Sequence, residues 1–431
     1  MCYSVYERYF MLDSLHSVPA PPLFEAHCRD AVQNLRGALT ALYQAVDADP
    51  TLPREVARQF QLDKSLTWKV ARVINAKDSF EAIGHIPGAS GLQILIRAMA
   101  DAGADDEAVE RVRGAIQAFD AMVEVHTGDR ASLELMLDSM GRSPSQRLER
   151  SRKLAFKGNS GIWGVQARVR LTCHILAPNP AMPHLLQSGL IGGMLDFRRL
   201  RPEQHWPLFR IHHYHDDGTP WEQLGNTTSS ATTDGTAEPI GETQPGQPHG
   251  LIRAFCSGDM STIMPVRDEQ GTTYLQHGGR VGKTGEVSCV IGQIDRVGVP
   301  RYRDEHNTVG ELYSTITAPI ETLLVDLLVH RSVAETIEPS VSLIGRPTGE
   351  LDMSPLARTK TALPMSERLS SIGSGPPALA SPLMPRYEEL VALAFEQGGW
   401  DLREFVGLRL VMKHPPMPSS VVVRFDLPES S

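Results

Sequence analysis

The spacing of apolar residues changes period along the chain, and this change limits the folds that the chain can adopt. Up to about residue 140, apolar residues recur every three to four positions, which is typical of helices with one buried face. From Val165 to Ile175, apolar and polar residues alternate, as in a strand that is buried on one side. The sequence therefore predicts an α+β multidomain protein, with an all-α N-terminal domain followed by a mixed α+β C-terminal region.

The length of 431 residues exceeds the size at which a single core stops growing, so more than one domain is expected. The predicted parts are an all-α domain at 1–140, an α+β domain at 141–345 with a flexible Gly/Thr/Pro-rich loop at 218–250, a Pro/Ser-rich linker at 346–384, and a small C-terminal α/β element at 385–431 that packs on the preceding domain.

Local patterns predict the individual elements. Helices are expected at 22–47, 53–60, 64–75, 90–102, 105–125, 130–139, 143–156, from about Pro319 to Leu328, and at 386–397, with Gly158–Gly161 breaking the seventh. Strands are expected at 165–175, 208–214, 286–297, 407–413 and 420–427, and as a hairpin at 262–267 and 272–276.

Several bulk features exclude other classes of protein. No run of 18 uncharged apolar residues is present, so neither a transmembrane helix nor a membrane partner is expected. The start, Met1–Arg8, lacks the basic and apolar regions of a secretory signal. The five cysteines are scattered without any C-x-x-C pair, which favours reduced thiols in a cytoplasmic protein and gives no sign of zinc binding.

The net charge of −9 argues against a protein that coats nucleic acid by bulk attraction, but the charges are unevenly distributed. Residues 53–77 contain six Lys/Arg and two Asp/Glu, and residues 141–170 contain eight Lys/Arg and one Glu. Basic segments in an acidic chain are common in sequence-specific DNA-binding proteins, although a solvated helix face explains the second segment equally well.

Residues 53–74 have the pattern of a helix-turn-helix. In a first short helix, Ala57 is small enough for two helices to cross closely, and Leu62 is the apolar residue of the turn. Asp63 or Ser65 can cap the second helix, whose inward stripe is Leu66, Val70, Val73 and Ile74. The residues expected to face outward and contact DNA are Lys64, Ser65, Thr67, Trp68, Lys69 and Arg72.

These residues resemble the helix-turn-helix of MarR-like and IclR-like bacterial regulators, through Leu62-Asp63-Lys64-Ser65 followed by Lys69-Val70. The resemblance covers about 22 residues and implies recognition-helix roles for Lys64, Ser65, Thr67, Trp68 and Lys69. Beyond it, the chain is similar to an uncharacterised bacterial helix-turn-helix family, which implies no activity.

The sequence departs from these families in two places. Gln61 stands where glycine is usual, so a left-handed conformation there carries a cost. The residues after the second helix lack the wing pattern, so a plain helical bundle is expected instead of a winged domain.

The sequence thus predicts a DNA-binding transcriptional regulator whose partner is double-stranded DNA. The C-terminal region would sense a small-molecule effector or support a homodimer, because one short helix reads few base pairs. No catalytic residue, metal ligand or cofactor is assigned. A helical hairpin that serves only packing is the alternative for residues 53–74.

Two other classes of function stay open. One is an enzyme with a site within 205–330, either at the His212–Asp217 cluster, where His213 and His215 share a strand face, or at Arg301–Asn307 with Glu311 and His330 nearby. The other is a protein-interaction adaptor. Trp163 with Gln166, Arg168 and Arg170 is a possible second nucleic-acid surface.

Overall fold

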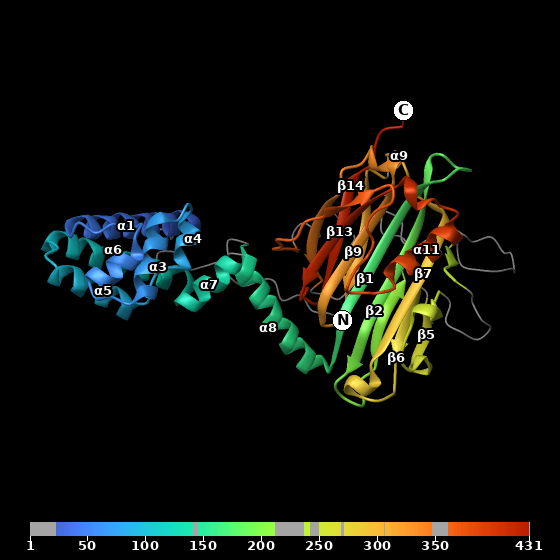
Figure 1. Cartoon of the computed structure of the whole chain (residues 1–431), viewed down its shortest axis with the longest axis horizontal. Helices are drawn as coiled ribbons and strands as arrows, with labels where there is room; N and C mark the ends of the chain where they lie inside the picture. Colours follow the sequence, from blue (N-terminus) through green and yellow to red (C-terminus); the bar gives the residue numbers. More distant parts are fainter. Residues whose placement is uncertain are drawn as a thin grey trace, which may run out of the picture. The chain divides into compact units, whose positions relative to one another are not determined.

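The computed structural model describes residues 23–140, 145–211, 237–241, 250–268, 271–305, 307–346 and 361–430. The chain divides into two compact units, Met1–Pro144 and Ser145–Ser431, called unit 1 and unit 2 (Figure 1). The protein is α+β, since a helical N-terminal region precedes a region of β-sheets with few helices. None of the described helices is long and apolar enough to cross a membrane.

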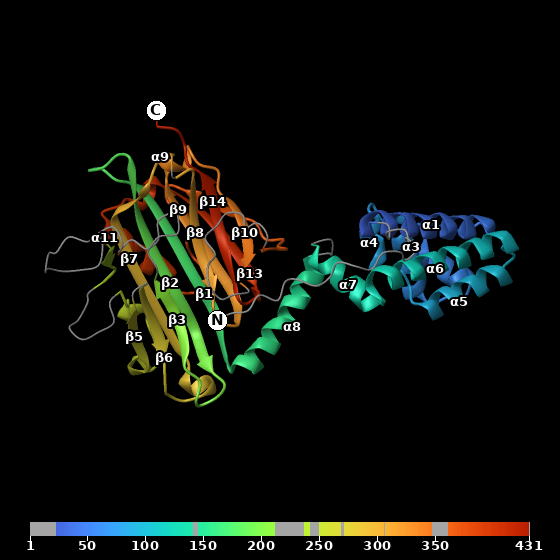
Figure 2. The same ribbon diagram turned by 180° about the vertical axis from the view of Figure 1, so that it is seen from behind.

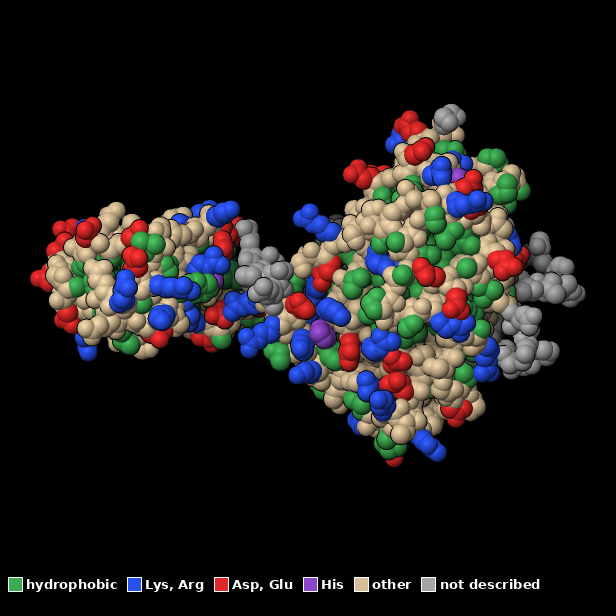
Figure 3. Space-filling view, in the orientation of Figure 1, with side chains coloured by type: hydrophobic (Ala, Val, Ile, Leu, Met, Phe, Trp, Pro, Cys, Tyr) green, Lys and Arg blue, Asp and Glu red, His purple; other side chains and the backbone are tan. Residues whose placement is uncertain are grey.

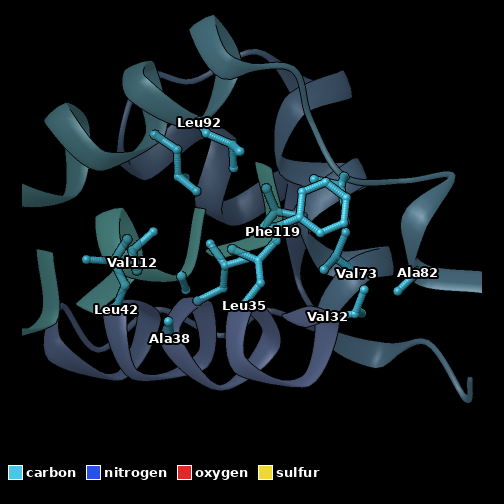
Figure 4. Packing of buried hydrophobic residues seen from close by; sticks show 14 of the residues in the cluster. Val32, Leu35, Ala38, Leu42, Val73, Ala82, Leu92, Val112 and Phe119 are labelled. Atoms are coloured by element: carbon cyan, nitrogen blue, oxygen red, sulfur yellow. The ribbon is translucent and has the colours of Figure 1, made fainter. Parts of the chain in front are cut away.

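The described part of unit 1 is entirely helical. Its helices are α1 (Phe24–Ala45), α2 (Pro53–Gln59), α3 (Lys64–Asn75), α4 (Ser79–Ile83), α5 (Ala89–Asp101), α6 (Asp106–Thr127) and α7 (Arg130–Ser139). The long helices α1 and α6 pack against each other, and their apolar stripes meet in one core around Leu35 and Phe119 (Figure 4). Because each stripe repeats at helical spacing, the helices predicted for this region are confirmed, and their ends agree with the prediction to within about two residues.

Aspartates fix the starts of several helices in unit 1. The side chain of Asp105 accepts a hydrogen bond from the Ala108 N–H, and that of Asp129 accepts one from the Ser132 N–H. Each bond satisfies a backbone donor that the first turn of a helix leaves unpaired.

Unit 2 begins with α8 (Ser145–Trp163), which is longer than predicted. The predicted break at Gly158–Gly161 is wrong, because the helix runs through these residues and turns only at Gly164, where φ is +68°. The low helix propensity of the two glycines does not end the helix, and Ser160 between them is buried and donates to the Phe156 carbonyl at 2.8 Å. The buried Arg152 donates to Glu367 at 2.6 Å and to the carbonyl of Pro364 at 2.9 Å, which fixes α8 against the rest of the unit.

A seven-stranded sheet forms the centre of unit 2, with the order β12-β13-β9-β1-β2-β7-β4 (Figures 1 and 2). Its strands are β1 (Val165–Pro178), β2 (Leu185–Arg199), β4 (Ala237–Pro239), β7 (Val287–Pro300), β9 (Ile320–His330), β12 (Ser370–Ser374) and β13 (Phe405–Lys413). Strands β1 and β9 are parallel, and the other neighbours are antiparallel.

Two smaller sheets pack on one face of the large sheet, and helix α11 (Tyr387–Gly398) packs on the other. One small sheet has the order β11 (Ala362–Leu363), β10 (Ser340–Gly345), β14 (Ser419–Asp426) and β8 (Val309–Ile316). The other has the order β3 (Trp206–Ile211), β6 (Gly271–Gln276) and β5 (Ile263–Asp268). The predicted hairpin is therefore confirmed as β5 and β6.

The helix predicted from about Pro319 to Leu328 is wrong, because this segment is strand β9. The strand lies between β1 and β13, and nearly all its residues are buried on both faces. A strand of this kind has an almost continuous apolar sequence, which does not distinguish it from a buried helix.

Two segments predicted to be irregular contain strands. Within the predicted loop 218–250, β4 pairs with β7, while residues 218–236 and 242–249 lie outside the described part of the chain. Within the predicted linker 346–384, β11 pairs with β10 and β12 pairs with β13. The C-terminal segment 385–431 supplies β13 to the large sheet and β14 to a small one.

Candidate nucleic-acid interface

Helices α2 and α3 meet through a short turn whose geometry follows from three residues. Ala57 is 4% exposed where the two helices pack, and Leu62 fills the turn at 8% exposure. The Leu62 N–H donates to the Ala57 carbonyl at 2.9 Å. Gln61 adopts φ +54°, so the turn uses the left-handed conformation at a non-glycine residue, as the sequence indicated.

Asp63 caps the N-terminus of α3. Its carboxylate accepts hydrogen bonds from the Ser65 N–H at 2.8 Å, the Ser65 hydroxyl at 2.5 Å and the Leu66 N–H at 3.3 Å. The two bonds from Ser65 and the one from Leu66 hold the pKa of the Asp63 carboxyl below its ordinary value. The predicted cap is confirmed at Asp63.

One side of α3 is buried and the other is free of acidic residues. Leu66, Val70 and Val73 are buried against the unit 1 core, as predicted. The predicted contact residues Lys64, Ser65, Trp68, Lys69 and Arg72 are exposed and share the opposite side, called here the outer face of α3. In Figure 3, Lys and Arg side chains gather on the visible surface of unit 1 where Figure 1 places α3.

Thr67 does not belong to this face, which corrects its predicted outward position. The side chain is fully buried, and its hydroxyl donates to the Pro53 carbonyl at the start of α2 at 2.8 Å. The residue therefore holds the two helices together. Thr67 lies at the border between the apolar stripe and the polar side, and its hydrogen bond to the start of α2 turns it inward.

Trp68 is fixed in place although it is 48% exposed. The Cζ atom of Arg72 lies 5.2 Å from the centroid of the Trp68 ring, within the range of a cation–π contact. The ring of His85 meets the Trp68 ring edge-on, with centroids 5.6 Å apart. Burial and the neighbouring positive charge of Arg72 lower the pKa of His85, which favours the neutral ring.

Sequence reasoning missed His85, because nothing in the sequence places the segment after α4 beside α3. Arg130 fixes this segment by donating to the carbonyls of Ile86 at 2.8 Å and Pro87 at 2.9 Å. Residues 23–140 contain no strand, so the prediction of a plain helical bundle without a wing is confirmed for this part of the chain.

The second nucleic-acid surface predicted around Trp163 is not assembled in the structure. Arg168 forms an ion pair with Asp196. Arg170 points between the sheets, where its Cζ atom lies 4.5 Å from the centroid of the Phe209 ring. Burial lowers the pKa of Arg170 to about 10. The alternation that predicted a strand is correct, but Arg170 on its polar face is covered by Phe209 of a second sheet.

Two members of the ionisable cluster at 301–307 have partners in the structure. Arg303 pairs with Glu429, and Asp304 accepts a hydrogen bond from the Asn307 N–H at 2.7 Å. His330 lies 3.4 Å from Glu404, so its carboxylate neighbour comes from a different segment. His306 lies outside the described residues.

The His212–Asp217 cluster, including His213 and His215, also lies outside the described residues. Within the described ranges, no group of three or more His, Cys, Asp or Glu side chains is arranged to hold a metal ion.

Comparisons with protein-family models, with curated proteins and with solved structures give no match for this chain. The resemblance of residues 53–74 to MarR-like and IclR-like regulators therefore stays a prediction.

Proposed function

We propose that the protein is a cytoplasmic DNA-binding transcriptional regulator that inserts α3 into the major groove of double-stranded DNA. Unit 2 would sense a small-molecule effector or support dimerisation. Two copies of α3 related by a two-fold axis would read two half-sites, since a helix of 12 residues reaches few base pairs.

The observation that carries the proposal is the outer face of α3. It presents Lys64, Lys69 and Arg72 on one side of the helix, and α3 contains no Asp or Glu. Lysine and arginine bind phosphate oxygens, while Ser65 and Arg72 offer groups that can meet base edges. The chain as a whole has a net charge of −9, so acidic residues outnumber basic ones. A helix that served only packing would have no reason to lack acidic residues on its exposed side.

The geometry of the turn supports the same proposal. Asp63, Leu62 and Thr67 fix the position of α3 against α2 through a cap, a buried side chain and a buried hydrogen bond. The outer face is therefore held by contacts on the other side of the helix, and it does not have to reorganise on binding. Such preorganisation reduces the entropic cost of complex formation.

The experiment begins by retaining fragmented genomic DNA on the immobilised full-length protein and sequencing the recovered fragments. The recovered fragments are then titrated with wild-type protein and with the double variant Lys64→Ala/Lys69→Ala. We expect the double variant to bind about tenfold or more weakly at moderate salt, because two phosphate contacts are removed.

The matched control is Arg111→Ala/Arg113→Ala, which removes the same charge from exposed positions of α6. This control should bind within about twofold of wild type. Equal binding by wild type and the α3 variant would contradict the assignment of the recognition helix. Recovery of no enriched DNA would contradict sequence-specific binding.

A further inference from the structure

Cys256 and Cys289 of unit 2 lie opposite each other on neighbouring antiparallel segments. The adjacent residues Ser257 and Ser288 exchange both backbone hydrogen bonds, each at 2.9 Å. In an antiparallel ladder, the next pair of residues is not hydrogen-bonded and has Cα atoms about 4.5 Å apart. By this register the next pair is Cys256 and Cys289, and that spacing is within the range that disulfides span.

The Cys256 side chain lies against β7, the strand that carries Cys289. The Val290 N–H donates to Sγ of Cys256 at 3.3 Å, so this sulfur lies against the backbone of β7. Cys256 follows the short turn Arg253–Phe255, and its Sγ also lies 3.3 Å from the carbonyl of Ile252. Cys289 lies opposite Cys256 by the register of the ladder.

The environments of the two thiols differ. Cys256 is half-buried and can be reached from solvent, whereas Cys289 is fully buried. The neighbouring Cys289 side chain lowers the pKa of Cys256, against the effect of burial, and the hydrogen bond from the Val290 N–H lowers it further. The Cys256 side chain and burial raise the pKa of Cys289. One sulfur is thus suited to be a thiolate, and its neighbour stays a thiol.

We propose that Cys256 and Cys289 form a dithiol site that small peroxides oxidise to a disulfide, with Cys256 reacting first. The Cys256 thiolate attacks one oxygen of hydrogen peroxide, the O–O bond breaks, and the departing hydroxide takes up a proton to become water. Cys256 is then a sulfenic acid.

In the second step, the sulfur of Cys289 attacks the sulfur of the Cys256 sulfenic acid. An S–S bond forms, the S–O bond breaks, and the proton of the Cys289 thiol leaves with the hydroxide as a second water. The two sulfurs together lose two electrons, and one peroxide is reduced to two waters.

Two other cysteines in the described chain provide internal controls. Cys28 and Cys173 are fully buried, and burial raises the pKa of each thiol. The proposed site does not depend on DNA binding, because all of its residues belong to unit 2.

The test treats the full-length reduced protein with hydrogen peroxide at a few equivalents, blocks the remaining thiols with iodoacetamide, and maps each cysteine by peptide mass spectrometry. We expect a Cys256–Cys289 disulfide that dithiothreitol reverses, with Cys28 and Cys173 still alkylated. In Cys289→Ser, the sulfenic acid at Cys256 should persist and be trapped by dimedone. Cys256→Ser should leave Cys289 reduced.

Three results would overturn the proposal. These are oxidation of Cys256 no faster than that of Cys28 and Cys173, a disulfide to any other cysteine, or over-oxidation of Cys256 without a disulfide in the wild-type protein. All three are read from the wild-type chain, so the test holds even if a serine variant fails to fold.

Discussion

Asp326 of β9 and Arg409 of β13 occupy the same register position of the large sheet and are joined by two hydrogen bonds of 2.8 Å and 2.7 Å. The Asp326 side chain is fully buried, and that of Arg409 is 14% exposed. Arg409 also donates to the carbonyls of Leu379 and Ala380. The pair with Asp326 raises the pKa of Arg409. Each of the two charged side chains thus has a partner of opposite charge beneath α11.

Removing one member of this pair is predicted to destabilise unit 2. Asp326→Leu leaves the Arg409 cation without its carboxylate, so we expect the free energy of unfolding to fall by about 3 kcal/mol or more. The double variant Asp326→Leu/Arg409→Met should recover most of that loss, because no unpaired charge remains. Urea-induced unfolding measures both, and a single variant as stable as wild type would contradict the buried pairing.

Thr67→Val separates a structural role from a DNA-contacting role. The hydroxyl of Thr67 is buried and donates to the Pro53 carbonyl, so we expect a loss of about 1–2 kcal/mol in stability. Affinity for the recovered DNA fragments should change less than twofold when it is measured on folded protein. The control Thr67→Ser keeps the hydroxyl. A large loss of affinity without a loss of stability would restore Thr67 to the outer face.

Gln61→Gly should stabilise unit 1. Residue 61 adopts φ +54°, which costs a residue with a side chain more than it costs glycine. We expect the free energy of unfolding to rise by up to about 1 kcal/mol. The control Gln93→Gly lies at an exposed interior position of α5 and should lower stability by a similar amount. Thermal unfolding distinguishes the two, and destabilisation by Gln61→Gly would contradict the left-handed turn.

His174 is predicted to make unit 2 sensitive to acid. Burial between the sheets lowers its pKa to about 4, against a backbone hydrogen bond with Tyr313 that acts in the opposite direction. Between pH 6.5 and pH 4 the unfolded chain therefore binds a proton that the folded chain does not, and stability falls as the pH falls.

The loss attributable to His174 is about 3 kcal/mol at pH 4 relative to pH 7. His174→Gln removes the titrating ring, so the difference in stability between variant and wild type should shift in favour of the variant as the solution is acidified. Urea unfolding at a series of pH values measures this difference. A difference that stays constant between pH 7 and pH 4 would mean that the ring is protonated in the folded protein.

The sequence was most informative where local rules determine structure. Apolar residues at helical spacing and the capping Asp63 were sufficient to predict α2 and α3 closely, because both signals act within one or two turns. Gln61 was identified as the unusual position of the turn for the same reason.

The prediction failed where structure depends on residues far apart in the chain. The apolar sequence of β9 was interpreted as a helix because only its two neighbouring strands bury it on both faces. Strand β2 was missed because its glycines weaken the strand signal. At Gly192 a side chain would meet Ile291 at 3.2 Å and Phe209 at 3.4 Å, so the packing of a second sheet explains the glycine.

The same difference between local signals and contacts far apart in the chain applies to the candidate interface. The exposure of Lys64, Lys69 and Arg72 follows from the helical period, whereas the contact of His85 with Trp68 depends on the path of the chain after α4. Arg170 was assigned to a possible nucleic-acid surface because its strand alternates, but the Phe209 ring that covers it belongs to β3, which begins 36 residues later.

The salt dependence of DNA binding tests the central proposal most directly. The affinity of full-length protein for a recovered fragment is measured between about 50 and 200 mM salt, for wild type, Lys64→Ala/Lys69→Ala and the Arg111→Ala/Arg113→Ala control. If α3 binds phosphates, the slope of log K against log salt should be shallower by about 1.8 in the α3 variant and unchanged in the control. Equal slopes for all three proteins would contradict the account of α3 as the DNA-binding helix.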